Sequence, residues 1–329
     1  MLILTKSPLR VSLTGGGTDF KDYYEKFEGH VISFAIQQYV YITLNKRFLD
    51  GIRFAYSKTE IVESSKDLEH NICREVLQNF SINSGLEIAT VADVPSRGTG
   101  LASSSAFTSA LIKAISEYLG VEITKEQLAQ QVCELEIEKV KAPIGKQDQY
   151  ASVYGGLNSI KFLKNEKVEV DPINIEEGDL NLFESSIALV YTGISRDAGK
   201  IISEQLNEGN YDLSKYYEKM HKIKEYSSQI QKLLLNMELQ SLGKILSESW
   251  EIKRSLSDNT SNSIIDEIYS KAIGLGAFGG KLLGAGGGGF ILLICPPDRR
   301  KNILEKLGCK YILPKLDFDG TSLIYKKKI

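Results

Sequence analysis

The sequence predicts an α+β protein with two domains, residues 1–175 and 176–329. The chain has 329 residues, 42% hydrophobic and 25% charged, which is enough material for two cores. Its first half mixes β-branched runs, typical of strands, with helical periods. Its second half carries long helical periods between strand-like runs. Helices layered on largely antiparallel strands are therefore expected in both halves.

In the first half, two helices are expected to follow three short strands. The strands are predicted at residues 11–13, 40–44 and 88–91. The first helix repeats apolar residues four apart and ends at Gly120. The second begins at Thr124, with Gln127 at capping-box spacing, and runs to about Val140. A loop at 142–152 and a strand pair at 158–163 and 167–170 complete this half.

The second half begins after a domain boundary that we place near residues 171–179. Strands are predicted at 187–191, 290–294 and 322–325. Helical patterns lie at about 198–206, 213–236, 238–256 and 262–274, with a short helix near 298–307. This order again predicts helices packed on antiparallel strands.

Charge and composition exclude several classes of partner. The 40 Lys and Arg residues balance 42 Asp and Glu, so no excess positive charge draws the chain to nucleic acid or an anionic membrane. No window is apolar enough to span a bilayer, and the N-terminus lacks signal-peptide features. The four cysteines and three histidines are scattered, without the spacing of a metal site or disulfide framework. We expect a cytoplasmic monomer or homodimer with a small-molecule partner.

A glycine- and serine-rich segment, PSRGTGLASSSA at 95–106, leads into the first predicted helix. Its glycines let the backbone approach a ligand, and three serines occupy the first helical turn. Free N–H groups and the positive end of the helix dipole meet there, which favours an anion. Serine hydroxyls can also bind phosphate oxygens or Mg²⁺. We interpret this segment, called the phosphate loop below, as a triphosphate site, against the alternative of a serine-capped glycine connection.

One carboxylate falls on the apolar face of the second predicted helix. At 3.6 residues per turn, Glu136 lies among Val132 and Leu135, whereas Glu134 and Glu138 point to the polar side. A carboxylate on an apolar face is costly unless something neutralises it. Mg²⁺ shared with a loop serine would do so, and an ion pair with Lys or Arg is an equal alternative.

Asp148 lies in the predicted loop after that helix, where Gly145 permits close approach to other elements. A hydroxyl that accepts a phosphoryl group needs a carboxylate to orient it and take its proton. Asp148 is a candidate for that role, and an ordinary turn aspartate is the alternative. Lys146 could stabilise this carboxylate or contact a substrate phosphate.

Two further glycine clusters lie near the two ends of the chain. RVSLTGGGTDF at 10–20 contains Asp19, a candidate sugar clamp because its two oxygens can accept from vicinal hydroxyls. KLLGAGGGGF at 281–290 indicates close backbone approach to a ligand or a neighbouring loop, with a glycine-rich hairpin as the alternative. From these clusters we assign Gly17, Thr18 and Gly286 to the substrate site.

In this order, PLRVSLTGGGTD, PSRGTGLASSSA, GKQDQYAS and KLLGAGGGGF resemble the GHMP kinases over nearly the whole chain. The resemblance implies an N-terminal domain like the second domain of ribosomal protein S5, a ferredoxin-like C-terminal domain, and ATP between them. Ser104 and Glu136 match the positions that bind Mg²⁺. Asp148 matches the catalytic aspartate, Arg10 its supporting arginine and Asp19 a sugar-binding aspartate. The implied phosphate contacts are Gly98, Gly100, Leu101, Ser103, Ser104 and Ser105.

The sugar is suggested by finer features of the same resemblance. Galactokinases carry GEHTD where this chain has GGGTD at 15–19, which makes galactose a poor substrate. TGGGTD and YTGISRDAGK are most similar to the heptose 7-phosphate kinases of the family, which phosphorylate the anomeric hydroxyl for nucleotide-heptose synthesis. A sugar phosphate needs cationic partners, and Arg196, Lys200 and Lys146 are candidates. A kinase for fucose, galactose or another sugar, and a catalytically silent ATP- and sugar-binding regulator, remain as alternatives.

Overall fold

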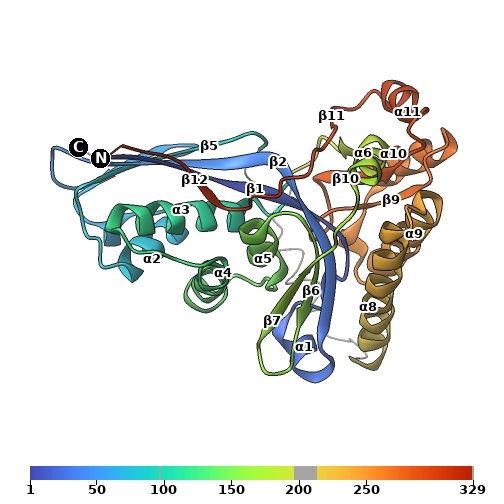
Figure 1. Cartoon of the computed structure of the whole chain (residues 1–329), viewed down its shortest axis with the longest axis horizontal. Helices are drawn as coiled ribbons and strands as arrows, with labels where there is room; N and C mark the ends of the chain where they lie inside the picture. Colours follow the sequence, from blue (N-terminus) through green and yellow to red (C-terminus); the bar gives the residue numbers. More distant parts are fainter. Residues whose placement is uncertain (96–97, 196–212, 328–329) are drawn as a thin grey trace.

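The computed structural model describes residues 1–95, 98–195 and 213–327, and it confirms the predicted α+β class. Two sheets form in the described part of the chain, a large one built mainly from the first half and a four-stranded one from the second half. Figure 1 shows them side by side, each with helices packed against it. Within the described residues, no helix is both long enough and apolar enough to cross a membrane.

The large sheet is organised around two long antiparallel strands, β1 (Leu2–Thr14) and β2 (Gly29–Lys46). Its main path runs β12-β1-β2-β5-β3-β4, and β6 and β7 branch from β2. Only β3 and β5 pair in parallel among the described strands. The remaining strands are β3 (Ile52–Ala55), β4 (Thr59–Val62), β5 (Leu86–Ala92), β6 (Leu157–Phe162), β7 (Val168–Pro172) and β12 (Ser322–Lys327).

Helices α2 (Asn71–Asn79), α3 (Ser103–Leu119), α4 (Lys125–Cys133) and α5 (Gln147–Tyr154) form a layer on one face of this sheet (Figure 1). Helix α1 (Lys21–Phe27) lies apart from this layer, where β2 begins, and a 3-10 turn lies at Ser65–Asp67. Gly120 ends α3 in the left-handed conformation, with φ 71°, as glycine at a helix end commonly does. Thr124 and Gln127 form the predicted capping box of α4.

Two features of the first half differ from the prediction. The second helix is α-helical only to Cys133 and continues as a π-helix, η2 (Glu134–Lys139), a wider turn that single-sequence periodicity does not distinguish. The expected loop at 142–152 was wrong over its second part, because α5 begins at Gln147. The proline and glycine at 143 and 145 follow the end of the second helix, and a new helix begins directly after them.

The second half packs helices on the small sheet, which has the order β11-β8-β10-β9. Its strands are β8 (Ile187–Tyr191), β9 (Gly279–Leu282), β10 (Phe290–Ile294) and β11 (Tyr311–Ile312). The helices of the second half are α6 (Glu177–Ser186), α8 (Leu213–Leu235), α9 (Leu239–Arg254), α10 (Ser263–Gly274) and α11 (Arg300–Leu307), with a 3-10 turn at Asp258–Thr260. Of these, α8 packs against α9 and against β1 and β2 of the large sheet. The helix expected at 198–206 lies outside the described residues.

The strand predicted at 322–325 is present as β12, but it does not join the small sheet. It pairs antiparallel with β1, from Leu2 opposite Lys327 to Lys6 opposite Ser322. The chain therefore returns to the large sheet at its end, and the two termini lie close together in Figure 1. Sequence order placed this strand with its neighbours in the chain, whereas pairing between strands far apart has no local signature. The division at residues 175 and 176 stays a prediction.

Candidate functional site

A cleft of about 770 Å³ opens between the two sheets. Its walls are β1, the glycine segment after β1, the phosphate loop, the segment before α5, helices α8 and α9, and the loop between β9 and β10. Two glycine loops meet at its edge: a Cβ on Gly100 would lie 2.5 Å from the Leu283 carbonyl oxygen, and one on Gly284 would lie 2.5 Å from the Gly100 Cα. The predicted close approach of the late glycine cluster to a neighbouring loop is thus confirmed, and the cluster also closes a hairpin.

The phosphate loop enters α3 through strained backbone. Gly98 and Gly100 have φ of 65° and 74°, and Ala102, with φ 63°, adopts the left-handed conformation that is uncommon for a residue with a side chain. Ser103, Ser104 and Ser105 then form the first turn of α3, whose leading N–H groups have no partner within the helix. All the phosphate contacts implied by the resemblance line the cleft, namely Gly98, Gly100, Leu101, Ser103, Ser104 and Ser105. The backbone can therefore hold an anion at this end of the cleft.

Glu136 is 1% exposed and lies behind the phosphate-loop serines. Its carboxylate accepts from the hydroxyls of Ser104 (3.2 Å), Ser105 (2.7 Å) and Thr108 (2.7 Å), and from the Gln149 side-chain amide (2.8 Å). Burial raises the pKa of Glu136, and these hydrogen bonds lower it by less. Among the described residues, the partners of this carboxylate are hydroxyl and amide groups, and no Lys or Arg forms an ion pair with it.

This donor set fits a hard divalent cation. A buried carboxylate without a cationic partner and an exposed serine hydroxyl on the cleft side are oxygen ligands of the kind that Mg²⁺ takes. Over residues 1–95, 98–195 and 213–327, no three His, Cys, Asp or Glu side chains gather as a metal cage. Mg²⁺ bound together with a nucleotide needs few protein ligands, because phosphates and water supply the others.

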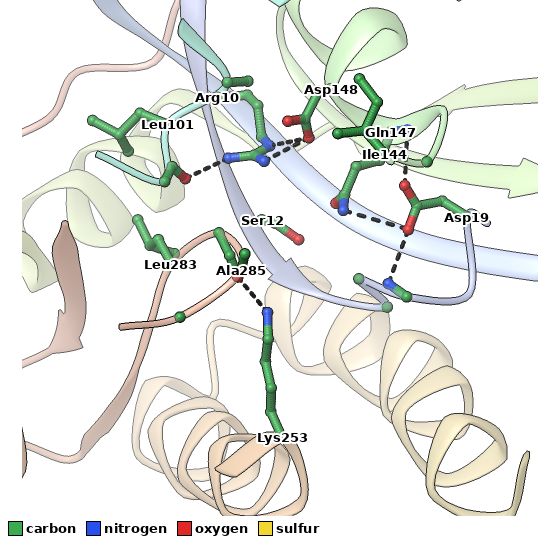
Figure 2. Close-up of a pocket in the computed structure, with 18 of the residues that line it drawn as sticks. Arg10, Ser12, Asp19, Leu101, Ile144, Gln147, Asp148, Lys253, Leu283 and Ala285 are labelled. Atoms are coloured by element: carbon green, nitrogen blue, oxygen red, sulfur yellow. Dashed lines mark hydrogen bonds and ion pairs between the residues drawn. The ribbon is translucent and has the colours of Figure 1, made fainter. Parts of the chain in front are cut away.

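Arg10 links the phosphate loop to Asp148. Its guanidinium donates to one Asp148 carboxylate oxygen through Nε (2.9 Å) and NH2 (2.5 Å), and through NH1 to the Gly100 carbonyl oxygen (2.6 Å). The Arg10 side chain is 4% exposed, whereas that of Asp148 is 22% exposed, so the second oxygen of Asp148 can face the cleft. Figure 2 shows this bridge across the upper wall. The turn-aspartate alternative does not account for the long-range ion pair.

Asp19 lies at the opposite end of the cleft from the phosphate loop (Figure 2). Its carboxylate accepts from the backbone N–H groups of Gly17 (2.9 Å) and Gln147 (3.1 Å). Burial, and then the charge of Asp148, raise the pKa of Asp19 to about 6. A Cβ on Gly145 would lie 2.0 Å from Asp19 Oδ2, so only glycine lets this segment pass the carboxylate. The two candidate carboxylates thus share one wall.

The structure does not bring every candidate to the cleft. Gly17 and Gly286 line it. Thr18 is fully buried beneath it, where its hydroxyl donates to the Gly15 carbonyl oxygen at 2.7 Å. Lys146 is not among the lining residues, and its ammonium lies 4.9 Å from the centre of the Tyr24 ring. Arg196 and Lys200 fall outside the described residues.

Two lysines that the sequence analysis did not assign line the cleft. Lys253 of α9 donates to the Gly284 carbonyl oxygen, and burial, followed by the charge of Arg10, lowers its pKa to about 8. Lys281 of β9 donates to the carbonyl oxygens of Ser12 and Leu13, each at 3.2 Å. Burial, followed by the charges of Lys253 and Arg10, holds the pKa of Lys281 well below its ordinary value.

Comparison with known proteins agrees with this geometry. A family model described as GHMP kinases N terminal domain matches residues 58–156, and one described as GHMP kinases C terminal matches residues 230–313. The chain is 33% identical over 317 residues to the D-glycero-alpha-D-manno-heptose 7-phosphate kinase of Campylobacter jejuni, with 93% of each covered. It is 26% identical to the galactokinase of Thermotoga maritima, with 92% of each covered. A solved structure of a D-glycero-D-manno-heptose 1-phosphate kinase from Bacteroides thetaiotaomicron superposes with a TM-score of 0.82 at 25% identity, over 100% of both chains.

Proposed function

Because the chain belongs to the GHMP kinases, we propose that it transfers the γ-phosphate of ATP to the anomeric C1 hydroxyl of D-glycero-D-manno-heptose 7-phosphate. The broader assignment, a sugar kinase with the GHMP fold, follows from the family match and the full-length relatives. The product would be the 1,7-bisphosphate, a precursor for nucleotide-heptose and surface-polysaccharide synthesis. The observation that carries the proposal is the bridge from Gly100 through Arg10 to Asp148, because it joins a phosphate site to a carboxylate.

In the proposed reaction, Asp148, Arg10 and the phosphate loop have separate roles. The bond between the γ-phosphorus and the oxygen shared with the β-phosphate breaks, and a bond to the C1 oxygen forms. Asp148 orients the C1 hydroxyl and accepts its proton, which then passes to solvent. Arg10 keeps Asp148 in place and adds positive charge beside the phosphate loop. The N–H groups at the start of α3 hold the remaining phosphates.

Mg²⁺ would be held by Ser104, with Glu136 directly behind it. When bound, Mg²⁺ supplies positive charge that offsets the charge of the phosphate oxygens. The chain contributes the buried Glu136 carboxylate, which three hydroxyls and one amide keep oriented toward that serine.

Asp19 is proposed to accept hydrogen bonds from the sugar hydroxyls. The backbone N–H groups of Gly17 and Gln147 fix the carboxylate, so it can receive a sugar without losing rotamer freedom. The relatives named for heptose phosphates support a heptose phosphate as acceptor, and they differ in where the acceptor carries its phosphate. We infer the 7-phosphate because its C1 hydroxyl is free to react.

A coupled ADP-release assay tests the acceptor. The panel contains heptose 7-phosphate, heptose 1-phosphate, free heptose, galactose and fucose, each with ATP and Mg²⁺. We expect the highest kcat/KM with heptose 7-phosphate. Turnover only with free sugars, or a preference for the 1-phosphate, would contradict the assignment. No turnover with any sugar would instead favour a silent regulator that binds ATP and sugar.

The role of Asp148 is tested by Asp148→Asn, which keeps the shape and removes the proton acceptor. We expect kcat to fall by about 10²–10⁴-fold while the affinity for ATP changes little. Asp171→Asn is the matched control, because Asp171 is an exposed residue of β7 whose carboxylate forms an ion pair with Lys161. Near-normal kcat in Asp148→Asn would show that another group takes the proton.

A further inference from the structure

We propose that Lys253 and Ser12 bind the phosphoryl group while it passes from ATP to the acceptor oxygen, an inference that rests on the proposed function. Neither residue belongs to the glycine and serine motifs of the phosphate loop. Both line the cleft, one from α9 and one from β1. In Figure 2 Ser12 lies between Arg10 and Lys253, and Asp148 and Asp19 lie to the right of Ser12.

The position of the Lys253 ammonium follows from two backbone contacts. Its Nζ donates to the carbonyl oxygen of Gly284. The Gly284 backbone packs directly on Gly100 of the phosphate loop. The Gly100 carbonyl in turn accepts from Arg10, the partner of Asp148. Lys253 is thus linked through Gly284 and Gly100 to Arg10, the partner of Asp148.

The charges around Lys253 leave room for an anion. Arg10 and Lys281 repel its ammonium, while Asp19 and Asp148 attract it. Asp148 is already paired with Arg10, and among the described residues Lys253 has no carboxylate within ion-pair distance. Three basic side chains, Arg10, Lys253 and Lys281, therefore face two carboxylates. A phosphoryl group with its negative charge spread over three oxygens fits this excess of basic groups.

Ser12 supplies an independent observation. It is 5% exposed, lines the cleft, and its hydroxyl has no hydrogen-bond partner among the described residues. A buried hydroxyl without a partner is uncommon, because it loses its hydrogen bonds to water. Lys281 fixes the backbone beneath it by donating to the Ser12 carbonyl oxygen at 3.2 Å. The hydroxyl is thus held in place and free to donate to a phosphoryl oxygen.

Lys253 keeps its proton throughout the transfer. The γ-phosphorus loses its bond to the bridging oxygen of ADP and gains one to the acceptor oxygen, and the acceptor proton goes to Asp148. Lys253 and Ser12 donate hydrogen bonds to the phosphoryl oxygens, whose charge shifts during the step. Their binding is expected to be strongest at that moment, so their loss should lower kcat more than it weakens substrate binding.

Lys253→Met tests this, since methionine keeps much of the aliphatic stem and removes the charge. We expect kcat to fall by about 10²-fold or more, with the KM for the sugar phosphate nearly unchanged. Ser12→Ala should show a smaller fall in kcat of the same kind. Lys219→Met is the matched control, because Lys219 also donates to a backbone carbonyl, that of Ser255, but at an exposed position.

An unchanged kcat in Lys253→Met would overturn the proposal. If the KM for the sugar phosphate also rose, the acceptor's own phosphate would be placed at Lys253. Thermal unfolding of each variant separates a loss of folding from a loss of catalysis.

A binding experiment keeps this test separate from the choice of sugar. Calorimetric titration with ADP, Mg²⁺ and aluminium fluoride, which mimics the group in transit, requires no acceptor turnover. Lys253→Met should lose the added affinity that aluminium fluoride gives the wild type, and retain ordinary ADP binding. Equal affinity in both proteins would overturn the role of Lys253, even if every sugar proved inactive.

Discussion

At the scale of single residues, burial moves four ionisable groups in and directly behind the cleft toward their neutral forms. The pKa values of Asp19 and Glu136 rise, that of Asp19 to about 6, and the pKa values of Lys253 and Lys281 fall, that of Lys253 to about 8. Each pKa shift reflects the free energy that it costs to hold the charged form of the side chain away from water, even before a substrate binds. For Asp19 the folded value lies above the ordinary 3.8, so its ionised form reduces stability as pH rises through about 6. The buried ionisable groups that could bind charged ligands therefore lower the stability of the folded protein.

These shifts predict a bell-shaped pH profile. The proposed sugar contact needs ionised Asp19, so kcat/KM should fall as pH drops below about 6. The proposed phosphoryl contact needs protonated Lys253, so kcat/KM should also fall as pH rises above about 8. The charged groups that bear on Lys253 are Arg10, Asp19, Asp148 and Lys281.

The pH dependence of kcat/KM in wild type and Lys253→Arg measures this directly. Arginine stays protonated throughout the range, so the alkaline limb should move upward while the acid limb stays in place. An alkaline limb that is the same in both proteins would assign it to another group.

At the scale of elements, the site depends on backbones that touch. The segment before α5 passes Asp19 so closely that Gly145 has no room for a methyl group. Gly145→Ala should displace the carboxylate and lower kcat/KM for the sugar by roughly 10-fold or more, since small misplacements strongly affect reaction rates. ATP affinity should hold, because the phosphate loop lies at the other end of the cleft.

Gly178→Ala in α6 is the control for this change. A Cβ there meets nothing within 4 Å, and alanine suits a helix better than glycine. Kinetics with varied sugar and fixed ATP should separate the two variants. If Gly145→Ala binds and converts the sugar as the wild type does, the close approach has no part in positioning Asp19.

Several features of the fold and the site could be predicted from residues close together in the sequence. The capping box at Thr124, the glycine end of α3 and the apolar-face position of Glu136 were all read from short-range patterns. Helix α5 was missed because it is only eight residues long and follows a proline and a glycine closely. The π-helix was missed because it interrupts the same apolar stripe that predicted the helix.

The two cleft lysines were missed for a different reason. Lys253 contacts a loop thirty-one residues away in sequence, and Lys281 contacts strand β1 from the other half of the chain. A signal was available for Lys253, since it continues the buried stripe of Leu242, Leu246 and Trp250 along α9. A lysine on such a stripe is the same signal as Glu136 on the apolar face of its helix.

At the scale of the whole molecule, β1 connects all parts of the site. It carries Arg10 and Ser12, pairs with β2 along most of its length, and receives β12 along its first residues. Lys281 ties it to the small sheet. The cleft therefore forms only when both halves of the chain are folded, which sequence motifs in separate segments could not show.

The return of β12 predicts a separation of stability from catalysis. Ending the chain after Thr321 removes every β12 residue that pairs with Leu2, Ile3, Leu4, Thr5 and Lys6. We expect Tm to fall by several degrees, because one edge of the large sheet loses its ladder. At low temperature kcat should remain close to wild type, since Arg10 and Ser12 still pair with Ala35 and Ser33 of β2.

Ile324→Thr keeps the strand and a β-branched side chain at an exposed position, so it should retain the wild-type Tm. Thermal unfolding and the ADP-release assay on both variants test this prediction. An unchanged Tm in the shortened chain would mean that β12 adds no stability. A loss of kcat while the shortened chain is still folded would mean that β12 also positions the site.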